Sequence, residues 1–275
     1  DEPDAPGRTR REYCYNILVS GLDDDNGGSD TNILVRFDVP NKRIDLVSLP
    51  RDTLLHNEYR NNKLNFAYAK GGTELLMEQI ENLLGIPVDF YVTVNLKGFI
   101  ALIDQIGGVD FDVPEDMDYD DPYQDLHIHF KKGLQHLSGQ QSMEVVRFRH
   151  NNDNTGYGGR QDIGRIGTQQ AFLKAVAKQL LQIGNVKNIP ALVDIFYTYV
   201  KTDLTTGNLV WLGNEALNIG TENIHFATLP GDGSGYYNKQ SVYVLDAQAT
   251  CDLVNEALNP YNEALTLEDM DILVP

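Results

Sequence analysis

The 275-residue sequence predicts an α/β protein, a three-layer α/β/α sandwich around a central mixed β-sheet. Segments typical of strands alternate along the chain with segments of helical periodicity, an order that places helices on both faces of one sheet. Two apolar strands joined by Val39-Pro40-Asn41-Lys42 form an expected antiparallel hairpin, which makes the sheet mixed. The hydrophobic fraction is 41%, and no apolar run reaches the roughly 18 residues that a membrane span needs.

The elements follow from apolar spacing and from residues that begin or end helices. Thr73 is the expected first cap of a helix that Gly85 ends, and Ser138 with Gln141 has the capping-box pattern. Asp162 precedes the longest helical pattern, and Asp246 precedes the last. The expected strands are 14–20, 31–39, 43–49, 89–95, 109–113, 125–130 and 223–229. The expected helices are 73–84, 96–106, 138–146, 162–183, 190–199, 208–219 and one that starts at 246.

The chain reads as one domain with short flanking segments. Residues 1–13 are polar and contain Pro and Gly, as in a linker from an upstream membrane anchor. Residues 14–260 form the single expected domain, and residues 261–275 form an acidic tail. No internal repeat or low-complexity tract interrupts it.

The chain is strongly acidic, with 40 Asp and Glu against 22 Lys and Arg, a formal charge of −18. Such a field disfavours nonspecific binding to nucleic acid, so no nucleic-acid partner is expected, and any local cluster of arginines needs a separate explanation. Cys14 and Cys251 lack the CxxC spacing of redox or zinc motifs. Whether they form a disulfide is left open.

Two stretches carry charge where the first and third strands end. Residues 21–30, GLDDDNGGSD, include Asp23 and Asp30 on a glycine-rich turn, and carboxylates gathered on one loop suit Mg²⁺. Asp, Asn and Gly are also ordinary turn formers, so this loop alone does not establish a metal site. Arg51 follows Pro50 at a strand end, where a surface ion pair with Asp52 is the simpler interpretation.

Two further stretches gather basic groups near helix ends. In EVVRFRH, Arg147 and Arg149 flank Phe148, so extended backbone would place both guanidinium groups on one side. Paired arginines favour a shared anion, because the guanidinium group binds phosphate in a bidentate manner. In DIGRIGTQQ, Arg165 lies in the expected first turn of a helix and Gln169 one turn later, where the helix dipole also favours an anion.

The remaining motifs give weaker evidence of function. His127 and His129 form an HxH pair that a strand would project to one face, but the sequence shows no third ligand. We interpret the pair as a packed or solvated strand face in preference to a zinc site. The sequence contains no GxSxG elbow, Walker loop or GxGxxG, which excludes the enzyme classes that depend on them.

Taken together, the motifs resemble the LytR-CpsA-Psr family, which attaches glycopolymers to bacterial cell walls. The matching stretches are NILVSGLD (16–23), GGSDTNILV (27–35), VSLPRDT (47–53), LNFAYAKGG (64–72), IDQIGGVDFDVP (103–114), GLQHLSGQQSMEVVRFRH (133–150), DIGRIGTQQ (162–170) and, more weakly, TLPGDGSGYY (228–237). The resemblance is specific because the order and spacing of many motifs carry it.

The resemblance implies a Mg²⁺-dependent phosphotransferase, with Mn²⁺ as an alternative ion. Its substrate would be a polyprenyl-pyrophosphate-linked anionic glycan, such as teichoic acid or capsule polysaccharide, and its acceptor peptidoglycan. By motif, Asp23 and Asp30 are the expected metal ligands and catalytic acids. Arg51, Arg147, Arg149 and Arg165 are the expected pyrophosphate ligands, with Gln169 nearby. The resemblance also implies tethering through an upstream helix to the extracellular face of the membrane, in a Gram-positive-type envelope.

This sequence departs from the family pattern at three places. The loop between Asp23 and Asp30 is short and has Asp25 where the family has arginine, and Thr168 stands where the family often has arginine. Residues 151–161 form a longer stretch than is typical, which suggests a different lid or acceptor groove. Two alternatives stay open: a hydrolase that cleaves the pyrophosphate with water, and a non-catalytic lipid-phosphate-binding regulator of the envelope.

Overall fold

The structure is a computed structural model that describes residues 7–22, 28–123, 126–157, 161–182, 193 and 196–275. The chain forms two compact units, Asp1–Asn95 with Val200–Pro275 (unit 1) and Leu96–Tyr199 (unit 2). The predicted Asp23, and half of the predicted helix 190–199, lie outside the described residues. None of the described helices is long and apolar enough to span a membrane.

Unit 1 is built on a six-stranded mixed sheet with the strand order β10-β3-β2-β1-β4-β9. The pairs β1–β4 and β10–β3 are parallel, whereas β1–β2, β2–β3 and β4–β9 are antiparallel. The strands are β1 (Cys14–Leu22), β2 (Ser29–Asp38), β3 (Arg43–Leu49), β4 (Phe90–Asn95), β9 (Val200–Thr202) and β10 (Ile224–Thr228). The predicted central mixed sheet is therefore confirmed.

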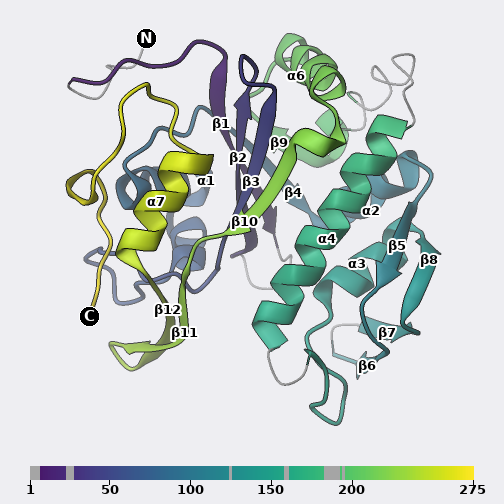
Figure 1. The fold of residues 1–275 in the computed structure, drawn as a ribbon. Helices are drawn as coiled ribbons and strands as arrows, with labels where there is room; N and C mark the ends of the chain where they lie inside the picture. Colours follow the sequence, from purple (N-terminus) through teal and green to yellow (C-terminus); the bar gives the residue numbers. More distant parts are fainter. Residues whose placement is uncertain (1–6, 23–27, 124–125, 158–160, 183–192, 194–195) are drawn as a thin grey trace. The chain divides into compact units, whose positions relative to one another are not determined.

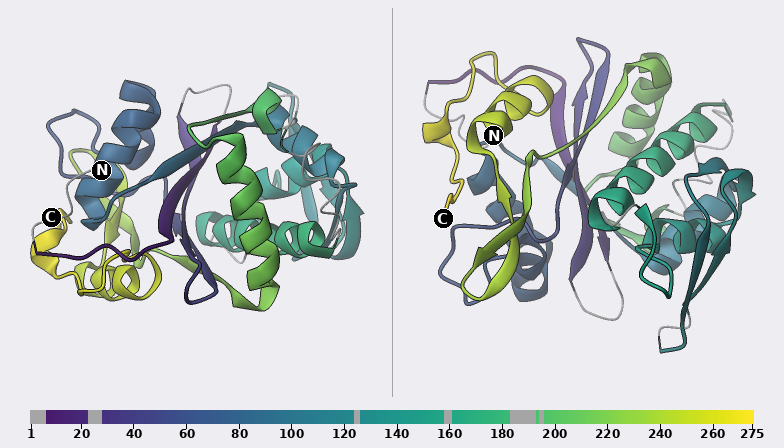
Figure 2. Two further views of the ribbon diagram at one scale, coloured as in Figure 1. Left: turned by 90° about the horizontal axis from the view of Figure 1, so that it is seen from above. Right: turned by 60° about the horizontal axis from the view of Figure 1, so that its bottom comes forward.

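Helices cover both faces of this sheet. Helices α1 (Leu64–Leu84) and α7 (Ala247–Ala257) lie on one face, and α6 (Thr206–Ile219) lies on the other (Figures 1 and 2). The three-layer α/β/α arrangement is thus present within unit 1. A two-stranded ribbon of β11 (Gly231–Tyr237) and β12 (Gln240–Leu245) completes the regular elements, with the short turns η3 (Thr221–Asn223) and η4 (Leu267–Asp269).

Helix α1 starts earlier than the sequence predicted. The range Leu64–Leu84 joins two helical stretches, because Gly71 and Gly72 between them have non-helical backbone angles. Gly72 has φ of 68°, a backbone conformation that favours glycine, so the second stretch begins directly after it, at the predicted Thr73. The predicted stop at Gly85 is confirmed, since Gly85 is left-handed and its N–H donates to the Glu81 carbonyl.

The ends of the chain pack against unit 1. Tyr261, Leu265 and Met270, from the segment predicted to be an acidic tail, are buried in the unit 1 core. Arg8 reaches the carboxylate of Asp269 at 2.6 Å. The described parts of both flanking segments are therefore held by side-chain contacts.

Unit 2 has its own core beneath two small antiparallel ribbons. Its elements are α2 (Leu96–Gln105), β5 (Val109–Val113), β6 (Met117–Asp121), β7 (Leu126–Phe130), β8 (Gly133–Leu137), α3 (Gly139–Arg147) and α4 (Gln161–Gln182). β5 pairs with β8 and β6 with β7. Apolar residues from these helices and strands form one cluster that includes Phe111, Ile128, Phe148 and Phe172.

The sequence predicted some of the elements of unit 2 and missed others. The capping box of Ser138 and Gln141 is confirmed. β6 and β8 were not predicted; β6 has the sequence MDYDD, which is rich in acid and poor in strand-forming residues. β6 is held by its partners: β7 pairs with one edge, and the side chains of Asn151 and Asn152 bond to its backbone.

Candidate functional site

In unit 1, Asp30 and Arg51 come from neighbouring strand ends. Asn32 of β2 pairs with Leu49 of β3, so the residues just beyond that pair emerge close together. The Arg51 Nη1 donates a hydrogen bond to Asp30 Oδ1. Their side chains are 30% and 29% exposed. The structure thus brings together two predicted site residues and leaves both accessible to a ligand.

Arg51 keeps hydrogen-bonding capacity beyond its bond to Asp30. Its Nε lies 3.8 Å from Asp52 Oδ1, too far for a hydrogen bond, and no described residue accepts one from this buried nitrogen. Asp52 instead lies 3.2 Å from Lys63 Nζ. The predicted ion pair of Arg51 with Asp52 is therefore present, but it is long, and Asp30 is the closer carboxylate. A guanidinium group with an unsatisfied donor suits an anionic ligand.

The expected magnesium ligands can be examined only in part. Asp30 offers a hard carboxylate oxygen at a strand start, which fits Mg²⁺ when phosphate oxygens and water complete the coordination. Within the described ranges, Asp30 belongs to no cluster of three groups that could hold a metal. Asp23 lies outside those ranges. Asp30 is thus compatible with a shared site in which the substrate supplies most of the ligands.

In unit 2, the chain leaves helix α3 at Phe148. Phe148 has φ of −57° and ψ of 134°, and its ring is fully buried. Arg147, the last helical residue, is half-buried, with its Nη1 3.9 Å from Met143 Sδ, and Arg149 is exposed. The buried ring therefore lies between two more accessible arginines, as the sequence led us to expect. That Arg147 and Arg149 share one ligand stays a prediction.

Helix α4 brings Gln169 to the end of α3. The Gln169 Nε2 donates to the Val146 carbonyl oxygen at 3.2 Å, next to Arg147 in the chain. Arg165, one turn before Gln169, is 8% exposed. Since α4 begins at Gln161, Arg165 lies in its second turn, slightly deeper than predicted. Unit 2 thus fastens the predicted α3 and α4 residues to each other.

Tyr157 is a residue of this region that sequence reasoning missed. Its hydroxyl lies 2.9 Å from Thr168 Oγ1, and its ring packs edge-on against Phe148. Burial raises the pKa of Tyr157, while the Thr168 hydrogen bond and the positive charge of Arg165 lower it. A Cβ on Gly164 would lie only 2.1 Å from the Tyr157 ring. Gly164, a glycine inside a helical pattern, was the available signal for this close approach.

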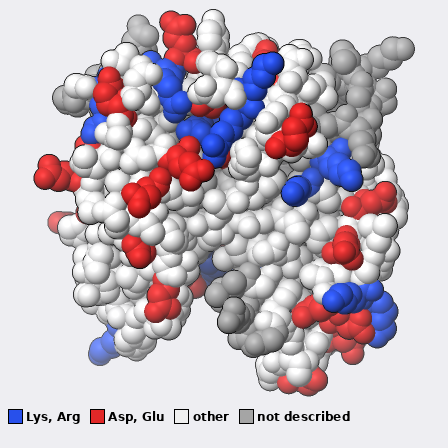
Figure 3. All heavy atoms as spheres, in the orientation of Figure 1, with Lys and Arg blue, Asp and Glu red and all other residues white. Residues whose placement is uncertain are grey.

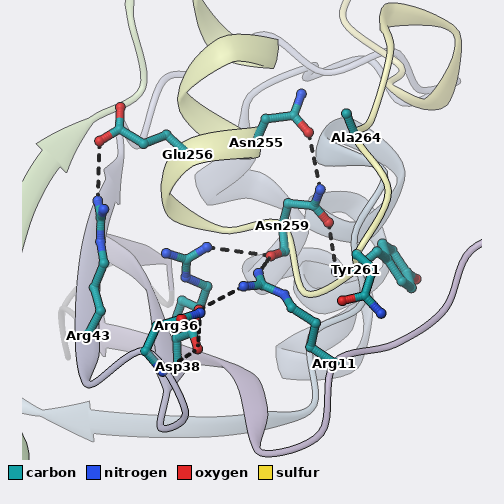
Figure 4. Close-up of a pocket in the computed structure, with 11 residues that line it drawn as sticks. Arg11, Arg36, Asp38, Arg43, Asn255, Glu256, Asn259, Tyr261 and Ala264 are labelled. Carbon is teal, nitrogen blue, oxygen red and sulfur yellow. Dashed lines mark hydrogen bonds and ion pairs between the residues drawn. The ribbon is translucent and has the colours of Figure 1, made fainter.

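A polar pocket among the described residues of unit 1 lies away from Asp30 and Arg51. A polar cavity of about 380 Å³ opens at the Asp38 end of β2, opposite the Asp30 end (Figure 4). Its arginines are matched by acids: Arg36 contacts Asp45 at 2.7 Å, and Arg11 contacts Asp38 at 2.8 Å. None of the predicted site residues lines it. Because its charges are balanced internally, we interpret this cavity as structural.

The visible surface shows the same pairing of charge. On the face drawn in Figure 3, basic side chains lie beside acidic ones instead of forming a separate basic field. The formal charge of −18 agrees with this mixed surface, in which no broad basic area is seen among the described residues on that face. Arginines that bind an anion must therefore act locally.

Comparison with known proteins identifies the same family as the motifs. The LytR_cpsA_psr family matches residues 7–259. A polyisoprenyl-teichoic acid–peptidoglycan teichoic acid transferase of Bacillus subtilis, TagV, is 32% identical over 249 residues, which cover 86% of this chain and 61% of the relative. The TagU transferase of Bacillus cereus is 31% identical over 245 residues, covering 87% of this chain and 76% of the relative. This chain thus spans about three fifths of the length of TagV.

The fold agrees with a solved structure from the same group. The crystal structure of B. subtilis TagV superposes with a TM-score of 0.77 at 28% identity, covering 96% of this chain and all of the other. The agreement confirms the predicted α/β fold class.

Proposed function

Because this chain belongs to the LytR-CpsA-Psr family, we propose that it transfers an anionic glycopolymer from a polyprenyl-pyrophosphate carrier to peptidoglycan. The similarity to TagV over 86% of the chain carries the proposal. The site residues support it, since Asp30 and Arg51 are paired at accessible strand ends. The corresponding location is the outer face of a Gram-positive-type cell membrane.

The proposed reaction is a single displacement at phosphorus. A hydroxyl oxygen of the acceptor forms a bond to the glycan-proximal phosphorus, the bond from that phosphorus to the bridging oxygen breaks, and polyprenyl phosphate leaves. The acceptor proton passes to a carboxylate, Asp23 or Asp30. Such a step needs no covalent enzyme intermediate, but it requires positioning and neutralisation of the charge that develops on the phosphate oxygens.

The chain's arginines would supply that neutralisation. Arg51 carries a buried Nε without an acceptor among the described residues, so it can donate to a phosphate oxygen while Asp30 orients it. In unit 2, Arg147, Arg149 and Arg165 stay the proposed ligands of an anionic group of the substrate, and Gln169 holds the α3 and α4 segments together through Val146. Bound Mg²⁺, or Mn²⁺, would add positive charge at the phosphates, with Asp23 and Asp30 as its protein ligands.

The test is an assay of the purified protein with a lipid-linked glycan, Mg²⁺ and peptidoglycan fragments. We expect glycan covalently joined to the acceptor. Released phosphoglycan without joined product would instead indicate the hydrolase, and binding without turnover would indicate the regulator. Either of these results would overturn the proposal.

Matched variants sharpen this test. Arg147→Ala and Arg165→Lys should each lower the transfer rate by about 100-fold or more, because lysine keeps the charge of Arg165 but loses its bidentate donors. Lys178→Ala, on the exposed face of the same helix α4, should transfer at the wild-type rate. Equal rates in all three variants would remove these arginines from the proposed mechanism.

A further inference from the structure

The β6–β7 ribbon of unit 2 has one buried face and one exposed polar face. Leu126, Ile128 and Phe130 of β7 are buried in the unit 2 core. The alternate positions of β7, His127 and His129, are therefore exposed on the opposite face. Across the ribbon, His127 pairs with Asp120 and His129 with Asp118. Four metal-ligating side chains thus share one exposed face.

Three of these side chains have ligand atoms close enough to share one ion. His127 Nδ1 lies 2.5 Å from Asp120 Oδ1, and His129 Nε2 lies 3.3 Å from the same oxygen. The ligand atoms of Asp120, His127 and His129 all lie within 4.8 Å of one another. Two ligands of a tetrahedral zinc ion, each about 2.0–2.1 Å from the metal, are separated by roughly 3.3 Å. Small side-chain rotations would therefore seat an ion between them.

Asp118 has the position of an orienting group. Its Oδ1 lies 2.8 Å from His129 Nδ1, and an ionised carboxylate can only accept, so this nitrogen carries the proton. In the neutral imidazole, the other ring nitrogen, Nε2, then carries the lone pair that a metal needs, and this nitrogen lies 3.3 Å from Asp120 Oδ1. A carboxylate that holds a histidine in this tautomer is a recurring feature of zinc sites.

Two side chains from outside the ribbon form hydrogen bonds with the backbone of both aspartates. The Asn151 Oδ1 accepts from the Asp118 N–H at 2.7 Å, and the Asn152 Oδ1 accepts from the Asp120 N–H at 2.6 Å. The Asn152 Nδ2 also donates to the Asp120 carbonyl oxygen at 3.1 Å. These asparagines begin the stretch that is longer than the family pattern. The stretch therefore fixes the spacing of the aspartates against the histidines.

We propose that Asp120, His127 and His129 bind a Zn²⁺ ion, with Asp118 orienting His129. Two imidazole nitrogens with one carboxylate oxygen favour zinc over Mg²⁺, which prefers an all-oxygen set. Three protein ligands leave a fourth position for water or for a group from another molecule. This site is independent of the proposed transferase function, because no residue is shared with it.

The test is a zinc titration of the purified, untagged protein against a chromogenic chelator, with Co²⁺ absorption as a second readout. We expect one high-affinity zinc per chain and a tetrahedral Co²⁺ spectrum. His127→Ala and His129→Ala should abolish both signals. Asp118→Asn should weaken zinc affinity by about 10–100-fold, since it alters an orienting residue and not a ligand.

The chain offers a matched control in the neighbouring ribbon. His136 Nδ1 lies 2.7 Å from Asp110 Oδ1 across β8 and β5, an exposed pair of the same chemistry with a single imidazole. His136→Ala should bind zinc as the wild type does. Zinc affinity that is unchanged in His127→Ala and His129→Ala, or that is lost equally in His136→Ala, would overturn the proposal. All of these side chains are exposed, so the variants should fold, which circular dichroism checks.

Discussion

The two ends of the β2–β3 hairpin carry the same residue types in different surroundings. At the closed end, Arg36 and Asp45 contact each other at 2.7 Å with side chains only 4% and 2% exposed. At the open end, Arg51 and Asp30 are about equally paired but 30% and 29% exposed. The difference teaches that burial, more than pairing, separates the structural ion pair from the one available to a ligand.

Burial also sets how each end should respond to substitution. Removing one partner of a buried ion pair strongly lowers the free energy of unfolding, because the remaining charge stays away from water. An exposed pair contributes little to stability, because water screens it. We therefore expect changes at the closed end to alter folding, and changes at the open end to alter function.

The largest expected effect on stability is at the closed end. Asp45→Ala should lower the free energy of unfolding by about 3–5 kcal/mol, because it leaves the buried Arg36 without its carboxylate. Urea unfolding measures this change. Asp30→Ala, at the open end of the same hairpin, should lower the free energy by less than about 1 kcal/mol. A comparable loss in both variants would remove the distinction between the ends.

Burial at the closed end of the hairpin should also make stability depend on pH, through the thiol of Cys14. This residue pairs with Asp38 at the closed end, and burial raises the pKa of its thiol from 9.0 to about 11, with the positive charge of Arg11 opposing that rise. A raised folded-state pKa stabilises the protein below the unfolded value, and that contribution is lost as the pH rises from 9 to 11. The expected loss is about 2–3 kcal/mol.

The measurement is the free energy of unfolding at pH 8 and at pH 11 in wild type, Cys14→Ala and Cys251→Ala. Burial raises the pKa of Cys251 as well, but the larger rise is at Cys14, so the pH-dependent loss should shrink more in Cys14→Ala than in Cys251→Ala. Both cysteines are buried and free, so no disulfide complicates the comparison. An identical pH dependence in all three proteins would show that Cys14 does not carry it.

At the open end, we expect substitution of Asp30 to change the Mg²⁺ concentration that transfer requires. Asp30→Asn removes the charge of a proposed magnesium ligand, so the Mg²⁺ concentration for half-maximal transfer should rise on the order of tenfold. Titration of Mg²⁺ in the transfer assay checks this. Asp52→Asn is the matched control, because Asp52 lies 3.2 Å from Lys63 and is not a proposed ligand. If both variants shift the requirement equally, Asp30 has no particular role in it.

Sequence reasoning succeeded where local chemistry decides structure. The capping box at Ser138, the left-handed stop at Gly85 and the position of Arg51 at a strand end all depend on neighbouring residues. The pairing of Arg51 with Asp30 then follows from the antiparallel register of one short hairpin. These parts of the fold and of the site were therefore predictable.

Sequence reasoning failed where distant residues decide structure. β6 has a poor strand sequence and depends on β7 and on Asn151 and Asn152, some 30 residues later. The third group beside the His127–His129 pair, Asp120, becomes visible only through that pairing. Tyr157 reaches helix α4 through tertiary packing on Gly164, and this glycine inside a helical pattern signals a close approach without naming the residue that makes it.

The most direct test of the central claim is the transfer rate of Arg51→Ala, measured at equal concentration of folded protein. The account predicts a loss of about 100-fold or more, with the free energy of unfolding within about 1 kcal/mol of wild type. Lys63→Ala, which breaks the adjacent ion pair with Asp52, should keep the wild-type rate. Wild-type transfer by Arg51→Ala, or a loss explained by unfolding, would contradict the account.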